Sequence, residues 1–369
     1  MGVFARPVPI VGAGAISAHG RDWRDLGQAL RSGPCQPTPS AELAASHPGT
    51  RSFEVKALSP PESVIEKRAR LLMSRSAILA SMATDAALRQ TTWDPLPRRQ
   101  GALDDVGFYL GVGASGGSVD QLTSMLAASV ENGELSLTRF GDQGLAACNP
   151  LFAFQLMNNF TLCHSAIFHG MHGPNAAFFS RGTGTVVALL EAAHAILDDD
   201  TSRALAGGAD SSVHSVTWAE LVREGWATRG LVPGEGAALL ALAHPTTPSD
   251  ALGFLDYVSV RACRTEPALL ALAGARAELD CSSIDAVVLA PWGPPARDAL
   301  LSFADESLRG RPVFDVEPVL GESLAASPAL AWTVALDLLG SEDLQRVLIL
   351  SSGLDGDLGI VTIRAGVAG

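Results

Sequence analysis

The stretch that decides the fold begins with GMHGPNAAFFSRGTGTVVALLEAAHAIL at residues 170–197, followed by ALAGGADSS at 204–212 and LVPGEGAALLALA at 231–243. The segment from Thr183 to Asp200 is apolar almost all round, which predicts a helix sunk in the core rather than one on the surface. The apolar runs 203–210 and 237–243 have the length and composition of strands buried on both faces. A buried helix among fully buried strands predicts an α/β fold with layered sheets.

The same alternation of strand and helix runs through the rest of the chain. Further strands are predicted over 8–14, 107–113, 285–290, 346–352 and 359–364. Helices are predicted over 21–33 and 67–90. Strand, turn, helix and strand follow one another in the N-terminal part and again from residue 285, which indicates two similar halves.

A polar stretch with proline and glycine, HPTTPSDALG at 244–253, separates these halves. We therefore expect an N-terminal half over 1–247 and a C-terminal half over 248–369. Together they would form one compact domain.

Composition excludes several classes of partner. The chain has 369 residues, is 47% hydrophobic and carries a formal net charge of -13. An acidic chain, with no Lys/Arg cluster expected to outweigh that charge, has no electrostatic reason to bind nucleic acid or anionic lipid. The apolar run from Val8 to Ile16 is too short to span a membrane. We therefore expect a cytoplasmic protein with neither nucleic acid nor membrane as a partner.

Signals for a metal or a cofactor are weak. Gly12–Gly14 follows a strand, but Ser17 occupies the third glycine position of the dinucleotide fingerprint and no acidic residue completes it. His164, His169 and His172 lie close together without an acid or cysteine at ligand spacing. The five cysteines are scattered with no C-x-x-C pair, which favours reduced thiols. We expect no metal and no cofactor.

The order of the motifs resembles that of the β-ketoacyl-acyl carrier protein synthases. In that family a Gly-Pro segment leads through a strand to T-A-C-x-S-G at the start of a buried helix, and A-G-G-A-[ED] and G-E-G-A follow. The matching segments here are Gly173-Pro174, Ala206-Gly207-Gly208-Ala209-Asp210 and Gly234-Glu235-Gly236-Ala237. VPIVGAGAISAHG at 8–20 and GFYLGVGASGG at 107–117 also resemble family segments. The resemblance implies a thiolase-like α/β fold, with two duplicated βαβαβ halves in layered α-β-α-β-α sheets.

The groups with which that family condenses acyl chains are missing here. Counting without gaps places Gly182 at the position of the cysteine nucleophile, whose pKa a helix N-terminus would lower. The motif of the first histidine matches residues 290–295, where Trp292 stands and no histidine occurs. In the motif of the second histidine Glu322 takes its place, and Leu354 takes the place of a gating phenylalanine.

Each of these residues has a less specific interpretation. Trp292 is expected to fill the vacated histidine pocket, with substrate binding as the alternative. Glu322 is expected to be solvated or salt-bridged, with a new acid or base as the alternative. Ser180 precedes the helix, but no histidine or lysine is placed by the sequence to activate it. We therefore expect no catalytic residue at these positions.

This pattern looks like the chain length factor of type II polyketide synthases. The resemblance implies a non-catalytic subunit that forms a heterodimer with an active ketosynthase, meets an acyl carrier protein through that complex, and helps to shape the elongation tunnel for a polyketide or fatty-acyl chain. Many chain length factors carry glutamine where this chain has Gly182, so the decarboxylation linked to that glutamine is not expected here. Two alternatives stay open: a remodelled acyltransferase or hydrolase of the same fold, and a stand-alone acyl-binding scaffold.

The tunnel lining is expected in the segment that follows the strand at 107–113. That region resembles the one that gates product length in chain length factors. The expected lining consists of its apolar residues Val119, Leu122 and Met125, together with Phe140. The alternative for each of the four is a role in the hydrophobic core.

Overall fold

The computed structural model describes residues 3–33, 35–56, 58, 65, 67–93, 101–113, 116–117, 119–247, 250–261, 274, 276, 278–354 and 356–366. Ten strands form one sheet, in the order β12-β11-β13-β14-β10-β1-β9-β8-β4-β7. The first five in the chain are β1 (Val3–Ile16), β4 (Gly107–Val112), β7 (Asn175–Phe179), β8 (Arg203–Ser211) and β9 (Glu235–Ala243). The other five are β10 (Gly253–Arg261), β11 (Ala286–Ala290), β12 (Val313–Asp315), β13 (Arg346–Ser352) and β14 (Leu358–Arg364).

The sheet is a duplication. From the sheet edge inwards, the N-terminal five strands lie in the order β7-β4-β8-β9-β1, and the C-terminal five in the order β12-β11-β13-β14-β10. In both sets, numbered along the chain, this is the order third, second, fourth, fifth, first. The two sets meet where their first strands, β1 and β10, pair antiparallel, with Val8 opposite Leu255 and Ile10 opposite Gly253. The internal echo in the sequence therefore corresponds to two halves with one strand order. β9 ends at Ala243 and β10 begins at Gly253; the exact division at 247/248 stays a prediction.

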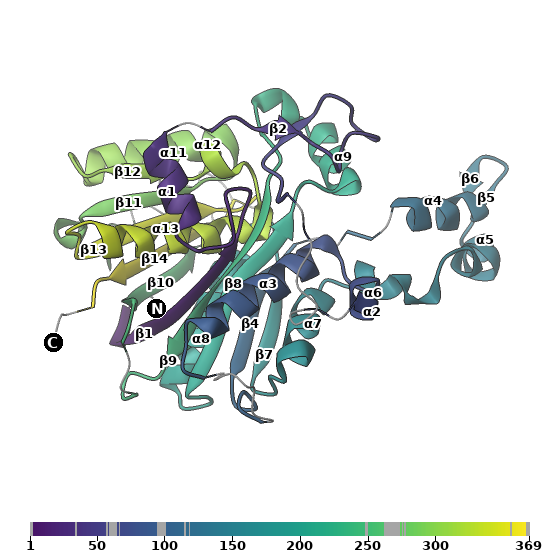
Figure 1. Ribbon diagram of the computed structural model, residues 1–369. Helices are drawn as coiled ribbons and strands as arrows, with labels where there is room; N and C mark the ends of the chain where they lie inside the picture. Colours follow the sequence, from purple (N-terminus) through teal and green to yellow (C-terminus); the bar gives the residue numbers. More distant parts are fainter. Residues whose placement is uncertain are drawn as a thin grey trace.

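The helices complete five layers (Figure 1). The helices that pack against strands of the sheet include α3 (Arg75–Arg89), α7 (Phe160–His169), α8 (Gly184–Leu197), α11 (Gly293–Ser307) and α13 (Ser327–Ser341). The other α-helices in the described residues include α1 (Asp25–Ser32), α2 (Lys67–Arg70), α4 (Val119–Ala128), α5 (Leu137–Arg139), α6 (Ala153–Leu156), α9 (Ser215–Arg223) and α12 (Glu317–Leu320). Successive residues of a strand point to opposite faces, so Phe108 lies in the cluster of α3 while Tyr109 lies in the cluster of α8 on the other face. In the same way, the C-terminal half has α13 on one face and α11 on the other.

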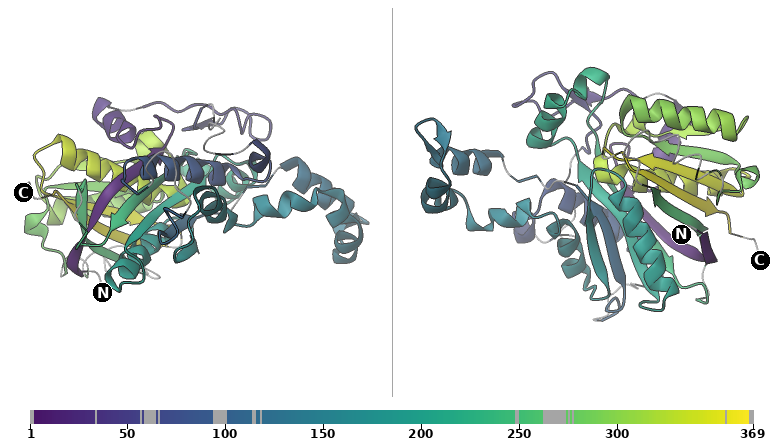
Figure 2. Two further views of the ribbon diagram at one scale, coloured as in Figure 1. Left: turned by 60° about the horizontal axis from the view of Figure 1, so that its bottom comes forward. Right: turned by 180° about the vertical axis from the view of Figure 1, so that it is seen from behind.

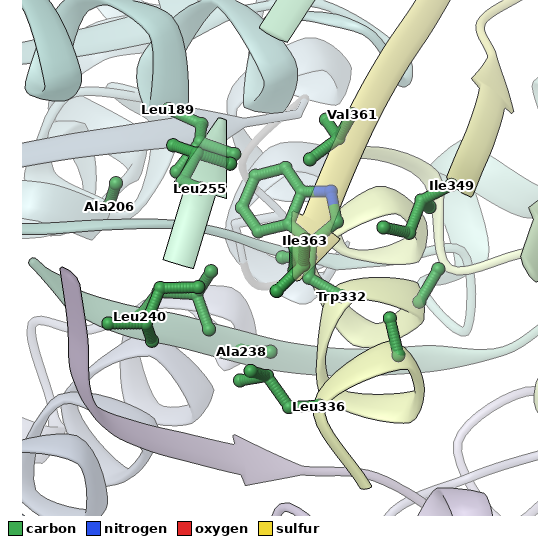
Figure 3. Close-up of a cluster of buried hydrophobic side chains, with 14 of the residues drawn as sticks. Leu189, Ala206, Ala238, Leu240, Leu255, Trp332, Leu336, Ile349, Val361 and Ile363 are labelled. Carbon is green, nitrogen blue, oxygen red and sulfur yellow. The ribbon is translucent and has the colours of Figure 1, made fainter. Parts of the chain in front are cut away.

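The centre of the molecule is the layer between the two halves (Figure 3). Trp332 of α13 is fully buried there, among Leu240 of β9, Leu189 of α8 and Ile363 of β14. Apolar side chains from both halves thus pack on one pair of helices. The helix predicted from Thr183 onwards is α8, and it is the core helix that its apolar composition predicts.

One apolar window in the described residues, Leu324–Ser341, is long and apolar enough to cross a membrane. However, 89% of this window is buried inside the fold, and it contains α13. A core helix of a large α/β domain has this property without any membrane.

Some predicted elements differ from the observed ones. The helix predicted over 67–90 is two helices, because Ser74 is extended and its side chain accepts the Ala77 N–H to cap α3. The sequence-based strands did not include β7, β10 or β12. Of the five cysteines, four are described, and none of these four forms a disulfide; Cys263 lies outside the described residues.

An arm projects from the body between β4 and β7 (Figure 2). It contains α4, the hairpin of β5 (Val130–Glu131) and β6 (Glu134–Leu135), α5 and several short helices. The hairpin turns at Asn132-Gly133, both with positive φ, as a tight hairpin turn requires. The arm is where the sequence places the tunnel residues.

Candidate functional site

The structure brings together the four positions that match functional residues of the family but carry other residues here. These are Gly182, Trp292, Glu322 and Leu354. Gly182 lies just ahead of α8, and the Leu354 N–H donates to the carbonyl of its neighbour Arg181 at 3.0 Å. The Trp292 N–H donates to Oγ of Ser352, the last residue of β13, at 2.8 Å. Glu322 lies on the turn before α13, two residues from Leu324, which packs in one cluster with Trp292 and Leu354. The four positions therefore surround one locus.

Gly182 has no room for a side chain. Its φ is +131°, a conformation that residues with a side chain rarely adopt. A Cβ atom built on it would lie 2.6 Å from Gly353 Cα and 3.0 Å from the Ser352 carbonyl oxygen. The backbone of the loop after β13 thus occupies the space in which a nucleophile's side chain would begin.

Ser180 has a structural role at this helix end. Its Oγ accepts the N–H of Gly184 at 2.6 Å, so the hydroxyl binds one of the amide groups at the start of α8. A hydroxyl engaged in this way stabilises the helix end. Nothing in this contact activates the oxygen as a nucleophile.

Trp292 is buried in an apolar cluster. It is 4% exposed and packs with Leu43, Val213, Trp218, Leu221, Leu231 and Leu324, with Trp226 and Leu354 at the border. The ring of Trp226 meets it edge to face, with centroids 5.7 Å apart. Tryptophan and leucine side chains therefore fill the volume around Trp292 and Leu354.

Glu322 corrects one expectation from the sequence. It is buried, at 2% exposed, and forms no salt bridge within the part of the chain that the structure describes; its Oε1 accepts the Leu324 N–H at 2.7 Å and the Ser327 hydroxyl at 3.3 Å. Leu324 is one of the few non-glycine residues with positive φ, at +54°. Such a conformation persists only where its surroundings hold it. The Glu322 carboxyl is one of the groups that hold it.

A second buried carboxyl fastens the same turn. Asp210 of β8 is 1% exposed, and its two oxygens accept the N–H groups of Ser211 and Ala325, at 2.8 and 3.3 Å. The Thr185 hydroxyl of α8 donates to the Ala325 carbonyl. This turn, Gly321–Ser327, is therefore tied to β8 and to the start of α8.

Burial dominates the ionisation of both carboxyls. It raises the pKa of Asp210 from 3.8 to about 7, although the N–H groups of Ser211 and Ala325 and the charge of Arg181 act in the opposite direction. Burial also raises the pKa of Glu322 well above 4.5, and the Leu324 N–H opposes this. The sequence did not point to Asp210 as an unusual acid, because its motif is matched and its burial is a tertiary property.

The residues expected to line a tunnel lie elsewhere. Val119, Leu122 and Met125 are on α4, and Phe140 follows α5, so all four are on the projecting arm (Figure 2). Met125 is 9% exposed, and a Cβ on Gly144 would lie 3.1 Å from its carbonyl oxygen and 3.2 Å from Phe140 Cδ2. Met125 is therefore buried within the arm, and the half-buried Phe140 lies close to the same glycine. Val119 is 37% exposed and Leu122 is half-buried.

A family model described as the β-ketoacyl synthase N-terminal domain matches residues 5–246, more than half of the chain. The chain belongs to the β-ketoacyl synthase family. No curated protein matches it.

Three solved structures resemble this β-ketoacyl synthase homologue over 98% of its length. A β-ketoacyl synthase from Burkholderia phymatum STM815 has a TM-score of 0.79, 18% identity and coverage of 100% of that chain. The ishigamide ketosynthase/chain length factor has a TM-score of 0.76, 21% identity and 99% coverage. A chain of a type II PKS acyl-carrier protein in complex with its ketosynthase bound to the hexaketide has a TM-score of 0.75, 14% identity and 100% coverage. At such identities the likeness shows the fold, and it confirms the predicted thiolase-like architecture.

The raised pKa of Glu322 generates a prediction about stability. The folded protein retains this proton at a pH where the unfolded chain has lost it, so stability is full below about pH 4.5 and falls as the pH rises towards the folded pKa. Glu322→Gln keeps an oxygen acceptor for the Leu324 N–H and cannot titrate. The variant should lose less stability than the wild type as the pH rises above about 4.5, by about 1.4 kcal/mol for each unit by which folding raises the Glu322 pKa. Urea unfolding across this range measures the difference.

The control is Glu306→Gln, at an exposed position on α11. Its stability should follow the wild type at every pH. A Glu322→Gln variant with the wild-type pH dependence would show that Glu322 is not held neutral in the folded protein.

Proposed function

We propose that this chain is a non-catalytic subunit of the chain length factor type, which pairs with an active ketosynthase and helps to shape the space in which the acyl chain grows. The observation that carries the proposal is Gly182. A condensing enzyme needs a thiolate at this helix N-terminus, and here the backbone of Gly353 lies 2.6 Å from where even a Cβ would be. The segments that match both histidine motifs, 290–295 and Gly321–Ser327, contain no histidine.

Two exposed surfaces support a partner subunit. β7 is the last strand at its end of the sheet, and Phe179 on it is 61% exposed. On the arm and the neighbouring α7, Leu137 is 79% and Ile167 is 72% exposed. An unpaired strand edge with large apolar side chains beside it is a surface that another chain covers. One of the structures of similar fold is described as a ketosynthase/chain length factor.

Carrier-protein docking would fall mainly on the ketosynthase. A chain of net charge -13 repels an acidic carrier at long range. Contrary to the expectation from the sequence, α2 does form a local basic turn of Lys67, Arg68 and Arg70, and the first two are exposed. A carrier protein could contact this turn in the assembled complex.

A remodelled hydrolase is the second candidate, because Asp210 and Glu322 are two buried acids near the start of α8. However, both oxygens of Asp210 and the Oε1 of Glu322 accept backbone N–H groups. Carboxyls bound in this way fasten the turn. This observation favours the non-catalytic subunit.

Partnership predicts which surface mutation separates the subunits. With a co-expressed intact ketosynthase, the wild-type chain should purify as a one-to-one complex. Phe179→Asp places a charge at the β7 edge and should weaken the complex at least about tenfold, because the charge loses its solvation in an apolar interface. Val313→Asp on β12, at the opposite end of the sheet and 38% exposed, is the matched control and should leave the complex intact. Analytical ultracentrifugation measures both. Equal effects of the two substitutions, or a wild-type chain that ignores the ketosynthase, would contradict the partnership.

Substitutions on the arm test whether it controls the length of the product. If it lines part of the tunnel at the subunit interface, Leu122→Ala or Val119→Ala should lengthen the product while the complex stays folded. Met125→Ala and Phe140→Ala remove a buried and a half-buried side chain of the arm and should lower its stability by about 2–5 kcal/mol. Mass spectrometry of the products and thermal unfolding of a reconstituted complex distinguish the two groups. If none of the four substitutions changes product length in a folded complex, the tunnel assignment is wrong, and the partnership would stand.

A further inference from the structure

A cavity lies where α3 ends, between this helix and the connection that follows β9. Its volume is about 450 Å³, which is within the range of small-molecule sites. We call it the Trp93 cavity. The described residues that line it are Val11, Gln90, Thr91, Thr92, Trp93, Ala243, Thr247 and Asp250.

The Trp93 cavity is remote from Gly182 and Glu322. The opposite end of α3 begins at Arg75, which pairs with Glu235 at 2.5 Å, and Glu235 accepts the hydroxyl of Ser211 at 2.8 Å. That end of α3 therefore lies towards Asp210 and the start of α8. A helix of 15 residues is about 22 Å long, and this length separates the cavity from that end.

Two local features of β1 shape the floor of the cavity. Gly12 allows α3 to end directly on the strand, because a Cβ there would lie 2.9 Å from the Ala87 carbonyl oxygen. Beside it the pairing with β9 shifts: Ile10 is opposite Leu242, but Gly12 is opposite Ala241. Val11 is thus the extra residue of a bulge, and a bulge turns a side chain away from its regular direction. The half-buried Val11 faces the cavity for this reason.

The wall is a turn held by one hydroxyl. The Thr91 hydroxyl donates to the Leu88 carbonyl at 2.8 Å and accepts the Trp93 N–H at 3.2 Å. These two bonds fix the chain after α3, so the half-buried indole of Trp93 has a fixed place beside the cavity. An aromatic wall and an apolar floor suit a ligand with an apolar body.

Polar groups at the rim are free to bind a ligand. The side chains of Gln90, Thr92, Thr247 and Asp250 are exposed and form no hydrogen bond or ion pair within the described part of the chain. Each of them offers an oxygen that can accept a hydrogen bond. The rim therefore suits a head group that donates several hydrogen bonds.

Charge decides the class of that head group. Asp250 is the one charged residue among the described lining residues. Arg203 lies beside the ring of Trp93, with its guanidinium carbon 5.6 Å from the ring centroid, but it pairs with Asp105 and also donates to the Ala102 carbonyl at 3.1 Å. The Asp250 carboxylate thus has no cation of its own there. A chain of net charge -13 also attracts cations at long range.

We propose that the Trp93 cavity binds an organic amine with an apolar or aromatic body. Its ammonium group pairs with Asp250 and donates to the oxygens of the rim, while its body packs on Trp93 and Val11. A positive charge near an indole ring adds to the attraction. Binding is non-covalent, and it goes beyond the proposed partner function because it uses none of the residues around Gly182.

The test is calorimetric titration of the full chain, at neutral pH, with three probes that share one body and differ in the charge of the head group. They are phenylpropylamine, phenylpropanol and phenylpropanoate. The wild type should bind the amine about tenfold more tightly than the alcohol, which is about 1.4 kcal/mol at 25 °C. The propanoate should bind most weakly, because its charge has the same sign as that of Asp250.

Three variants locate the site. Asp250→Asn keeps the size of the side chain and removes its charge, so the amine should bind only as tightly as the alcohol. Asp305→Asn, at an exposed position on α11, is the matched control and should keep the tenfold preference. Trp93→Leu should weaken the binding of the amine and of the alcohol.

Four results would overturn the proposal: no saturable amine binding up to millimolar concentration, equal or tighter binding of the alcohol or the propanoate, a preference for the amine that survives in Asp250→Asn, or unchanged affinities in a folded Trp93→Leu variant. Asp250 is exposed, so its substitution is a valid test even if Trp93→Leu does not fold. The isolated chain is used throughout, so the outcome is independent of the ketosynthase partnership.

Discussion

The two buried helices α8 and α13 begin at the same place, and the hydrogen bond from the Thr185 hydroxyl to the Ala325 carbonyl joins the segments where they start. Both helices are packed between the two halves of the sheet, so the start of each is fixed by the whole core. Gly182 precedes one helix and Glu322 precedes the other. Any chemistry at the locus depends on what these two turns present, and here Gly182 and Glu322 stand where the resemblance places the cysteine and the second histidine.

Packing and hydrogen bonding occupy the positions at which the resemblance places the family's catalytic groups. The loop after β13 lies against Gly182, and the carboxyl of Glu322 supports the unusual backbone of Leu324. Trp292 and its neighbours form an apolar cluster. The proposed partner subunit would need such a locus, because its surface must keep its shape although it does not react. The cost at Glu322 is a buried carboxyl with a raised pKa, which an apolar residue at this position would have avoided.

Much of this fold could be predicted from the sequence, and the reasons lie in particular residues. The apolar runs that became β8, β9, β11, β13 and β14 are buried on nearly all positions, so composition alone identifies them. β10 was missed because Asp256 and Arg261 interrupt its apolar pattern; Asp256 is paired with Arg346 of β13, a contact no local pattern reveals. β7 was missed because, at the sheet edge, its residues alternate between exposed and half-buried. The spatial gathering of Gly182, Trp292, Glu322 and Leu354 followed from motif order. The positive φ of Gly182, the burial of Glu322 and the projection of the arm are tertiary properties that motif order does not contain.

The central claim is that this locus forms no acyl-enzyme. Intact-mass spectrometry of the purified chain after incubation with an acyl-carrier thioester tests it most directly, with an active ketosynthase as the positive control. The account predicts an unchanged mass for this chain, because Gly182 offers no side chain and Ser180 caps α8. A stable acyl adduct that maps to Ser180, or to a cysteine near the locus, would contradict it.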